Sequence, residues 1–466
     1  MSLARPLLEV GVLTTAVSAA SVAWAGWTDV LVSLGRASLL ALCCVVAFYY
    51  NDLYDSRIVG TFGDFVSRLL QALGVASILL AAIYAFVPNA KTSNGALLLS
   101  ILAILAVLVP LRAVPYGLMR RRLFFERVLI LGWSPVAEKI VREIEARPYL
   151  GYQIIGIVDD AGGGDQTPYG YPLLGPVERL DKILKDITPD RIILAMAERR
   201  AHLPTRQLLD ARMDGIAIED GVNAYERFTG KIAIESLTPS NLIFSSDFRK
   251  SRIDLAAGRA TSLLVAIVGL IAFAPLMALI AIAIKLDSLG PVFFVQQRLG
   301  MHSRRFKMVK FRTMRVAENA PSEWVLDNCA RITRVGKWLR KFRLDELPQF
   351  VNVIRGDMNL VGPRPHPVSN AELFSEGIPY YSVRCAVRPG ITGLAQVRLG
   401  YANNLEEETE KMRYDLYYIK HLSFVLDLRI LFYTVKIVLF GRGAQAADVH
   451  VTDMHAHAAA MESSGR

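Results

Sequence analysis

Four apolar segments fill the first quarter of the chain, and each is close to the length that a helix needs to cross a lipid bilayer. They cover residues 7–24, 30–50, 65–87 and 96–116. Because only Arg5 precedes the first segment and three further apolar runs follow it, a transmembrane helix is favoured there over a cleaved signal peptide. The sequence therefore predicts a membrane protein in which residues 1–120 form a bundle of four transmembrane helices.

Basic residues are distributed unevenly around these segments. Arg57 and Arg68 follow the second segment, a cluster of arginines that includes Arg120 and Arg127 follows the fourth, and only Lys91 follows the third. Positive charge collects on the cytoplasmic side of membrane proteins. The N-terminus and everything after the fourth segment are therefore predicted to face the cytoplasm.

Composition indicates a soluble part beside the membrane part. The chain has 466 residues, of which 53% are hydrophobic, and its mean hydropathy is +0.33. The 53 Lys and Arg against 43 Asp and Glu give a net charge of +10, and the cations cluster near the ends of apolar segments. This favours anionic lipids or phosphorylated substrates as partners, with no nucleic acid, because no nucleic-acid-binding pattern is visible. The four cysteines suggest neither a disulfide framework nor a metal site.

Residues 126–250 show short apolar runs that alternate with helical periodicity, which predicts a Rossmann-like α/β domain with a parallel sheet. The first turn, residues 132–137, lacks the spacing of the GxGxxG fingerprint, although Asp159 and Asp160 stand where a ribose-binding acid is expected. Two roles stay open for this domain: nucleotide binding, or regulation and oligomerisation. We expect the protein to be a homodimer, with this domain as a reasonable dimerisation surface.

Residues 258–285 form a fifth long apolar segment, which begins a predicted α/β catalytic domain, residues 251–448. Basic residues flank this segment on both sides, which argues against crossing. Pro275, near its middle, removes a helical hydrogen bond, so we expect a re-entrant membrane helix that bends and returns. The alternative is a fifth span with an extracellular catalytic domain.

Residues 423–440 are predicted to be an amphipathic interfacial helix, and residues 449–466 a disordered tail.

The acidic pair Asp345 and Glu346 stands out for its surroundings. Pro348 is tolerated in a first helical turn, so a helix is expected to begin near Asp345, with free backbone N–H groups facing the pair. A carboxylate can attack phosphorus when cations absorb the charge, and the second can hold Mg²⁺ together with substrate phosphates. The candidate cations are Lys310, Arg312, Arg340 and Arg343.

Two rigid elements add phosphate-binding candidates. Arg364 lies between Pro363 and Pro365, which fix the backbone on both sides of a guanidinium suited to bidentate phosphate binding. Arg388 precedes a proline and glycines that permit close backbone approach.

The stretch from about residue 252 to 444 resembles the bacterial sugar transferases, the monotopic phosphoglycosyl transferases that act on polyprenyl phosphate. The motifs that carry the resemblance occupy residues 290–294, 297–300, 310–314, 344–349, 356–358, 361–365, 388–393 and 414–420. Four spans and a Rossmann-like domain before the catalytic part are similar to the large members that initiate exopolysaccharide, capsule or O-antigen synthesis at the bacterial inner membrane.

The resemblance implies a two-step reaction. Asp345 would attack the sugar-bearing phosphate of a UDP-sugar, with UDP-glucose or UDP-galactose expected, and release UMP; undecaprenyl phosphate would then take the phosphosugar from Asp345. Glu346 would bind Mg²⁺ with Asp345 or assist the second step. Lys310, Arg312, Arg340 and Arg364 would contact phosphate or uridine. Asp357 and Asp415 are expected to orient basic side chains.

Two other classes of function remain to be weighed. A membrane-anchored nucleotide-sugar dehydratase or epimerase needs a Tyr-x-x-x-Lys pair, and none of the 17 tyrosines has a lysine four residues on. A non-enzymatic membrane scaffold that senses nucleotide through the Rossmann-like region is the other class, but it does not explain the cluster of acidic and basic residues around Asp345 and Glu346.

Overall fold

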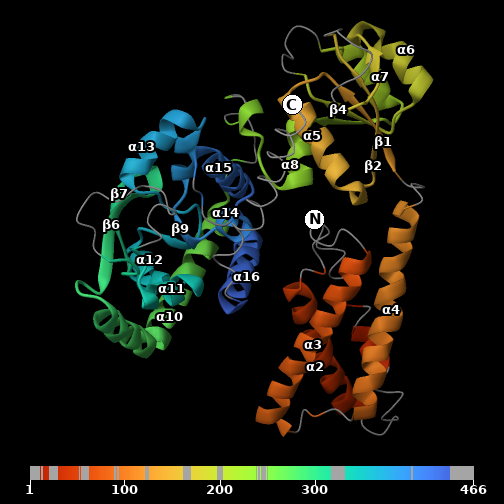
Figure 1. Ribbon diagram of the computed structural model, residues 1–466. Coiled ribbons are helices and arrows are strands. Elements are labelled where there is room, and N and C mark those ends of the chain that lie inside the picture. The colour runs from red at the N-terminus through yellow and green to blue at the C-terminus, as the bar shows by residue number, and fades with distance from the viewer. Residues whose placement is uncertain are drawn as a thin grey trace, which may run out of the picture. The chain divides into compact units, whose positions relative to one another are not determined.

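The structure is a computed structural model that describes residues 11, 14–19, 30–51, 53, 62–88, 91, 94–120, 125–160, 169–196, 203–237, 239, 242, 248, 250–315, 331–399, 402 and 404–440. The chain divides into two compact units, residues 1–219 and 220–466, whose helices and strands are labelled in Figure 1. Most of the predicted first segment, residues 7–24, and the whole predicted tail, residues 449–466, lie outside the described residues.

Three long helices occupy the region predicted to form the membrane bundle: α2 (Val30–Tyr50), α3 (Phe62–Phe86) and α4 (Asn94–Arg120). The buried positions of α3 recur every three or four residues, which is the spacing of one helix face. They are Phe65, Leu69, Ala72, Ala76 and Leu80. This face packs into an apolar cluster with residues of α2 such as Phe48, while Leu70 and Ile78 on other faces of α3 are exposed.

Two helices of the described chain are long and apolar enough to cross a membrane, α3 and α10 (Arg252–Asp287). Shorter apolar stretches, Leu34–Tyr50 and Leu97–Val107, lie within α2 and α4. The described residues therefore support a membrane-associated α/β protein.

A five-stranded sheet with strand order β3-β2-β1-β4-β5 completes the first unit. Its strands are β1 (Glu126–Leu131), β2 (Tyr152–Val158), β3 (Leu173–Gly175), β4 (Arg191–Leu194) and β5 (Ala217–Asp220). Strand β1 pairs in parallel with β2 and β4, and β2 pairs in parallel with β3. The connecting helices are α5 (Pro135–Ala146), η3 (Pro148–Leu150), η4 (Val177–Arg179), α6 (Leu180–Ile187) and α7 (Thr205–Met213). The predicted parallel sheet is confirmed.

Asp159 and Asp160, at the end of β2, bind backbone groups of their own domain. The Trp133 N–H donates to Asp159 Oδ1 at 3.2 Å, and the Val177 N–H donates to Asp160 Oδ1 at 2.7 Å. The two acids therefore stabilise the turns around the strand ends. In the first of these turns, Gly132, at φ +90°, lies so close to Met196 that a Cβ would come within 2.6 Å of the Met196 backbone.

The second unit is built around the long helix α10 and an antiparallel hairpin. The hairpin strands are β6 (Phe293–Leu299) and β7 (Arg305–Phe311), and a short parallel pair consists of β8 (Asn359–Val361) and β9 (Gly390–Thr392). The helices around them are α8 (Gly221–Thr229), η5 (Ile234–Ser236), η7 (Met301–Ser303), α11 (Arg334–Lys341), η9 (Leu344–Gln349), α12 (Phe350–Arg355), α13 (Val368–Gly377), η10 (Tyr381–Ala386), α14 (Leu394–Arg398), α15 (Leu405–Lys420) and α16 (Phe424–Phe440). Residues 232–237 share an apolar cluster with α13 and α15.

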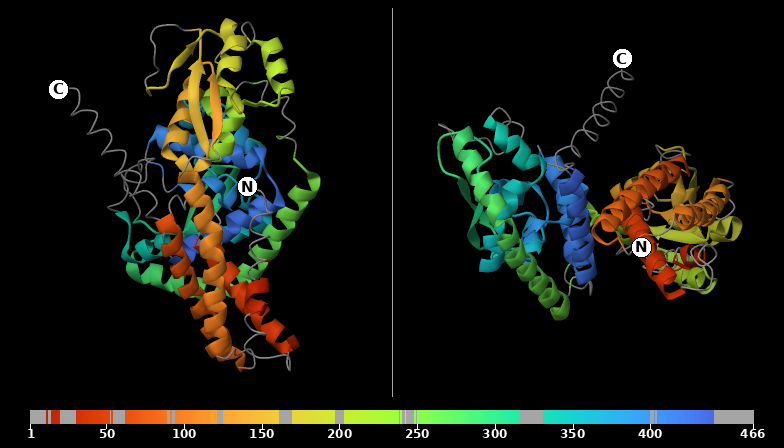
Figure 2. Two further views of the ribbon diagram at one scale, coloured as in Figure 1. Left: turned by 90° about the vertical axis from the view of Figure 1, so that its right-hand side faces the viewer. Right: turned by 90° about the horizontal axis from the view of Figure 1, so that it is seen from below.

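Small residues on one face of α10 allow it to pack closely against the rest of the unit. Gly258, Ser262, Ala266 and Gly269 are buried at spacings of three or four residues. Ser262 Oγ accepts a hydrogen bond from the Leu360 N–H of β8 at 3.1 Å. Pro275 lies inside the helix, and Figures 1 and 2 show that the helix changes direction along its length. A proline in a helix interior removes a hydrogen bond and is a common cause of such a bend.

Asn352 joins α12 to the hairpin. Its side chain is fully buried; Oδ1 accepts from the Val309 N–H at 3.1 Å, and Nδ2 donates to the Lys307 carbonyl at 2.7 Å. Because α12 directly follows η9, these two bonds fix the segment that contains Asp345 and Glu346 against β7.

Glycines allow β9 and the loop after β8 to approach each other. A Cβ on Gly390 would lie 2.1 Å from the Gly362 nitrogen and 2.3 Å from the Thr392 oxygen, both backbone atoms. A Gly390→Ala substitution should therefore force the two segments apart and lower the free energy of unfolding by about 1–3 kcal/mol.

Thermal unfolding of the detergent-solubilised chain measures this effect. Gly74→Ala, at a helical position in α3 with nothing within 4 Å of the added methyl group, is the matched control and should not destabilise the protein. If Gly390→Ala unfolds at the wild-type temperature, the close approach of these segments is wrong.

Candidate functional site

The acidic pair lies in η9, which leads directly into α12, close to the helix start that the sequence predicts. Both acids are buried, with Asp345 8% and Glu346 7% exposed. A buried carboxylate loses its hydration and needs a partner to stay ionised. The partners of the two acids differ.

Glu346 is held by arginines. Arg364 Nη1 donates to Glu346 Oε1 at 2.8 Å, and Arg343 Nη1 lies 4.0 Å from Glu346 Oε2. Burial opposes the charged form, but the two guanidinium groups prevail and hold the pKa of Glu346 below its ordinary value. Glu346 is therefore an ionised anchor for Arg364.

The Asp345 carboxylate has no hydrogen bond or ion pair to the side chain of any residue that the structure describes. Burial, and next the adjacent charge of Glu346, raise the pKa of Asp345 to about 6, although Lys310, Arg364 and Arg340 lie near enough to oppose the rise. Unlike Glu346, the Asp345 carboxylate is not held by a hydrogen bond from a described cation, so its oxygens stay available to a substrate, as a nucleophile requires.

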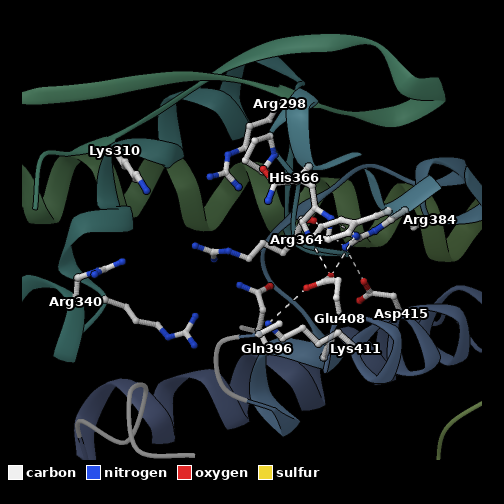
Figure 3. Close-up of a pocket in the computed structure, with 16 residues that line it drawn as sticks. Arg298, Lys310, Arg340, Arg364, His366, Arg384, Gln396, Glu408, Lys411 and Asp415 are labelled. Atoms are coloured by element: carbon white, nitrogen blue, oxygen red, sulfur yellow. Dashed lines mark hydrogen bonds and ion pairs between the residues drawn. The ribbon is translucent and has the colours of Figure 1, made fainter. Parts of the chain in front are cut away.

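A cavity of about 180 Å³ is lined by Arg343 and Arg364, the two partners of Glu346, and Figure 3 shows side chains from several elements converging on it. Neither Asp345 nor Glu346 is among the residues that line it. Cationic residues contribute to its lining from several sides: Arg298, Lys310, Arg340, Arg343, Arg364, Arg384 and Lys411. Burial, and next the repulsion of Arg298, lower the pKa of Lys310 to about 7, and burial followed by repulsion from Arg364 lowers that of Arg298 to about 9. The cavity thus concentrates positive charge beyond what its own acids neutralise.

The structure brings only some of the predicted binding residues to this cavity. Lys310, Arg340 and Arg364 line it. Arg312 is buried elsewhere: its guanidinium donates to the Ser288 carbonyl at 2.7 Å and to the Leu289 carbonyl, and so fastens the loop after α10 to β7. Arg388 is exposed and donates to the Gly356 carbonyl at 3.2 Å.

The two prolines around Arg364 serve the loop rather than the cavity wall. The Pro363 carbonyl accepts the Gly390 N–H at 3.0 Å, and the Pro365 carbonyl accepts from Arg298 Nη1. Both contacts fix the backbone on either side of Arg364, as the sequence predicts for a rigid, pre-aimed guanidinium.

A buried polar network at the far side of the cavity is not among the predicted site residues. His366 Nε2 lies 3.0 Å from Glu408 Oε1, and His366 Nδ1 lies 2.7 Å from the Tyr381 hydroxyl. Burial, and next the charge of Arg384, lower the pKa of His366 to about 4, so the ring is neutral and its Nε2–H donates to Glu408. The one available signal in the sequence was the position of His366 directly after Pro365.

Arg384 connects this network to the loop that contains Arg364. Its Nη2 donates to Asp415 Oδ2 at 2.8 Å and to the Arg364 carbonyl at 3.0 Å. Asp415 therefore orients a basic side chain, as expected. Asp357 instead accepts from the Asn352 amide at 3.1 Å.

The family model for bacterial sugar transferases matches residues 253–441, which include this whole site. A relative named UDP-glucose:undecaprenyl-phosphate glucose-1-phosphate transferase, from Klebsiella pneumoniae, is 36% identical over 66% of this chain and 67% of its own length. The chain belongs to the bacterial sugar transferase family. A second family model, described as a CoA-binding domain, matches residues 50–202.

Two further relatives of this family show that it includes proteins named for different sugars. One, from Aeromonas hydrophila, is named UDP-N-acetylgalactosamine-undecaprenyl-phosphate N-acetylgalactosaminephosphotransferase and is 42% identical over 47% of this chain and 52% of its own length. The other, from Escherichia coli K12, is named UDP-glucose:undecaprenyl-phosphate glucose-1-phosphate transferase and is 33% identical over 66% of both chains. The chain spans about half to two thirds of the length of these relatives. A nucleotide-sugar dehydratase or epimerase is not favoured by these matches.

The donor set at the acidic pair suits a divalent cation only in part. Within the described ranges, no group of three or more His, Cys, Asp or Glu side chains could hold a metal ion. Mg²⁺ commonly uses one or two carboxylates and completes its shell with water and substrate phosphates. The Asp345 carboxylate is available for this, and Glu346 offers the oxygen that does not bind Arg364.

Removal of Arg384 tests how far the transferase site depends on the buried network. An Arg384→Ala substitution leaves Asp415 buried without its cation, and breaking such a pair costs about 3–5 kcal/mol of folding free energy. The double variant Arg384→Ala/Asp415→Ala removes both charges and should be less destabilised than the sum of the two single variants, by about 1–3 kcal/mol. Thermal or denaturant unfolding of the four proteins measures this coupling. Strictly additive effects would show that the pair is not a unit.

Proposed function

We propose that the protein transfers a hexose-1-phosphate from a UDP-sugar to undecaprenyl phosphate, giving undecaprenyl-diphospho-sugar and UMP. The observation that carries the proposal is the Asp345 carboxylate, which is buried, has no ion pair with a described residue, and lies two residues after Arg343, a residue in the wall of a cation-lined cavity. The names of the relatives support the same substrates. UDP-glucose and UDP-galactose are the proposed donors.

In the proposed first step, an Asp345 carboxylate oxygen attacks the phosphorus that bears the sugar. A new O–P bond forms, the P–O bond to UMP breaks, and UMP departs with the electron pair. In the second step, a phosphate oxygen of undecaprenyl phosphate attacks the same phosphorus and displaces Asp345, which is regenerated. No oxidant, reductant or further reactant is needed.

The neighbouring residues have separable parts in this scheme. Glu346 holds Arg364 at the cavity wall through their 2.8 Å ion pair, and Lys310 and Arg340 neutralise phosphate charge as it develops. Mg²⁺ held by Asp345 and Glu346 would supply further charge neutralisation at the phosphates. Burial first, and next the repulsion of neighbouring arginines, lower the pKa of Lys310 and of Arg298, and an anionic substrate would offset that repulsion.

The membrane arrangement belongs to the same proposal. Four N-terminal helices span the inner membrane, and α10 enters from the cytoplasmic side, bends at Pro275 and returns, since basic residues flank both ends of its apolar part. The catalytic unit then lies at the cytoplasmic face, where a soluble nucleotide-sugar and a lipid phosphate can both reach it. The reaction is the first membrane step of an exopolysaccharide, capsule or O-antigen pathway, and the Rossmann-like domain is the proposed dimerisation surface.

Replacement of the nucleophile tests the reaction. Asp345→Asn should lower UMP release from UDP-glucose or UDP-galactose, with undecaprenyl phosphate and Mg²⁺ present, by at least about a thousandfold. Without the lipid acceptor, wild-type protein should gain the mass of one hexose phosphate on the peptide that contains Asp345. Glu376→Gln, an exposed carboxyl change on α13, is the matched control and should leave turnover unchanged. Normal turnover by Asp345→Asn would exclude the covalent mechanism.

The acid limb of the pH profile tests the electrostatics of the pair. Because Asp345 must be ionised to attack and its pKa is raised to about 6, kcat/KM should fall as the pH drops through about 6. Glu346→Gln removes a charge that raises this pKa, so in that slower variant the acid limb should move to lower pH. A wild-type limb near pH 4, the ordinary range of an aspartate, would contradict the assignment.

A further inference from the structure

Arg343 has the least favourable backbone of the arginines that line the cavity. It follows Phe342, the C-cap residue of α11, and has φ +52° and ψ +25°, in the left-handed region. This is the position after a helix where glycine is strongly favoured, because a side chain there crowds its own backbone. A left-handed arginine persists only where the surroundings or a ligand offset that strain.

The side chain of Arg343 is not well satisfied by the fold. It is 15% exposed, its nearest acid is Glu346 at 4.0 Å, and Arg364 already binds that carboxylate at 2.8 Å. Its Nε is buried and has no hydrogen-bond partner among the residues that the structure describes. A buried guanidinium donor without an acceptor costs folding free energy. Neither the backbone conformation nor the side chain of Arg343 therefore stabilises the folded protein when no ligand is bound.

The location of Arg343 indicates what would satisfy it. Arg343 lines the same cavity as Arg340 and Arg364, whose side chains extend into the central space in Figure 3, and it lies two residues before Asp345. The described wall there is richer in cations than in carboxylates, so the missing acceptor is an anion. Phosphate oxygens are strong acceptors for guanidinium groups.

We propose that Arg343 binds the diphosphate of the nucleotide-sugar, and that the chain tolerates a strained, incompletely bonded arginine at this position for that reason. The inference rests on the proposed function. It adds to the substrate-binding residues an arginine that strengthens substrate binding and lowers the stability of the protein without ligand.

Binding of UDP to the full-length protein tests the proposal without requiring turnover. Arg343→Gly removes the cation and supplies the residue that the backbone favours, so it should weaken UDP binding by 10-fold or more while the unfolding temperature without ligand stays equal or rises. Arg343→Lys keeps a cation and the strain, and it should recover part of the UDP affinity without gaining stability.

The matched control is Ser303→Gly, at a second left-handed position, φ +58°, in the turn between β6 and β7 and outside the cavity. It should leave UDP affinity unchanged. The proposal is overturned if UDP affinity in Arg343→Gly stays within twofold of wild type, if the wild-type protein binds no UDP, or if affinity and unfolding temperature fall together and lysine restores neither. A failure of the proposed reaction would be distinct, because it would appear as normal turnover in Asp345→Asn while the effect of Arg343 on UDP binding persisted.

Discussion

The buried guanidinium of Arg384 is the contact on which the geometry of the site depends. It joins Asp415 on α15 to the backbone of Arg364, which belongs to a loop with no regular structure of its own. Prolines restrict the conformation of that loop but do not fix its position relative to α15. Arg384 fixes that position, because its guanidinium donates charge-assisted hydrogen bonds both to the loop and to α15. Because Arg364 in turn holds Glu346, the placement of the acidic pair relies on a residue about forty positions later in the chain.

Uncompensated charge is the second organising feature of the catalytic unit. Most buried ions of a protein are paired, and here the Asp415–Arg384 and Glu346–Arg364 pairs follow that rule. Lys310 and Arg298 depart from it, since burial lowers the pKa of both, and repulsion from Arg298 on Lys310 and from Arg364 on Arg298 lowers it further. Such an arrangement is poor for stability and suitable for recognising a multiply charged anion, which supplies the missing negative charge on binding.

Sequence reasoning predicted the elements of the fold better than it predicted which side chains meet. The parallel sheet followed from short apolar runs that alternate with helical periodicity, and the helix start near Asp345 and Glu346 followed from Pro348 and the helical spacing after it. Arg312 could not be placed, because an arginine beside the site and one that fastens a loop have the same local sequence; only the Ser288 and Leu289 carbonyls tell them apart. The His366–Glu408 contact spans 42 positions, so no local pattern predicts it.

The two adjacent carboxylates illustrate why neighbours in sequence can differ in chemistry. Asp345 and Glu346 share one short turn and nearly the same burial, so desolvation acts on both. The two side chains point in different directions. That of Glu346 reaches Arg364 in a rigid loop, and that of Asp345 reaches no fixed partner in the described structure. Paired titratable groups that are pushed apart in this way commonly divide acid, base and nucleophile roles between them. A site that paired both acids would be more stable, but it would leave no carboxylate free to attack. By leaving Asp345 without a partner, the fold therefore loses stability at this position and keeps a reactive carboxylate.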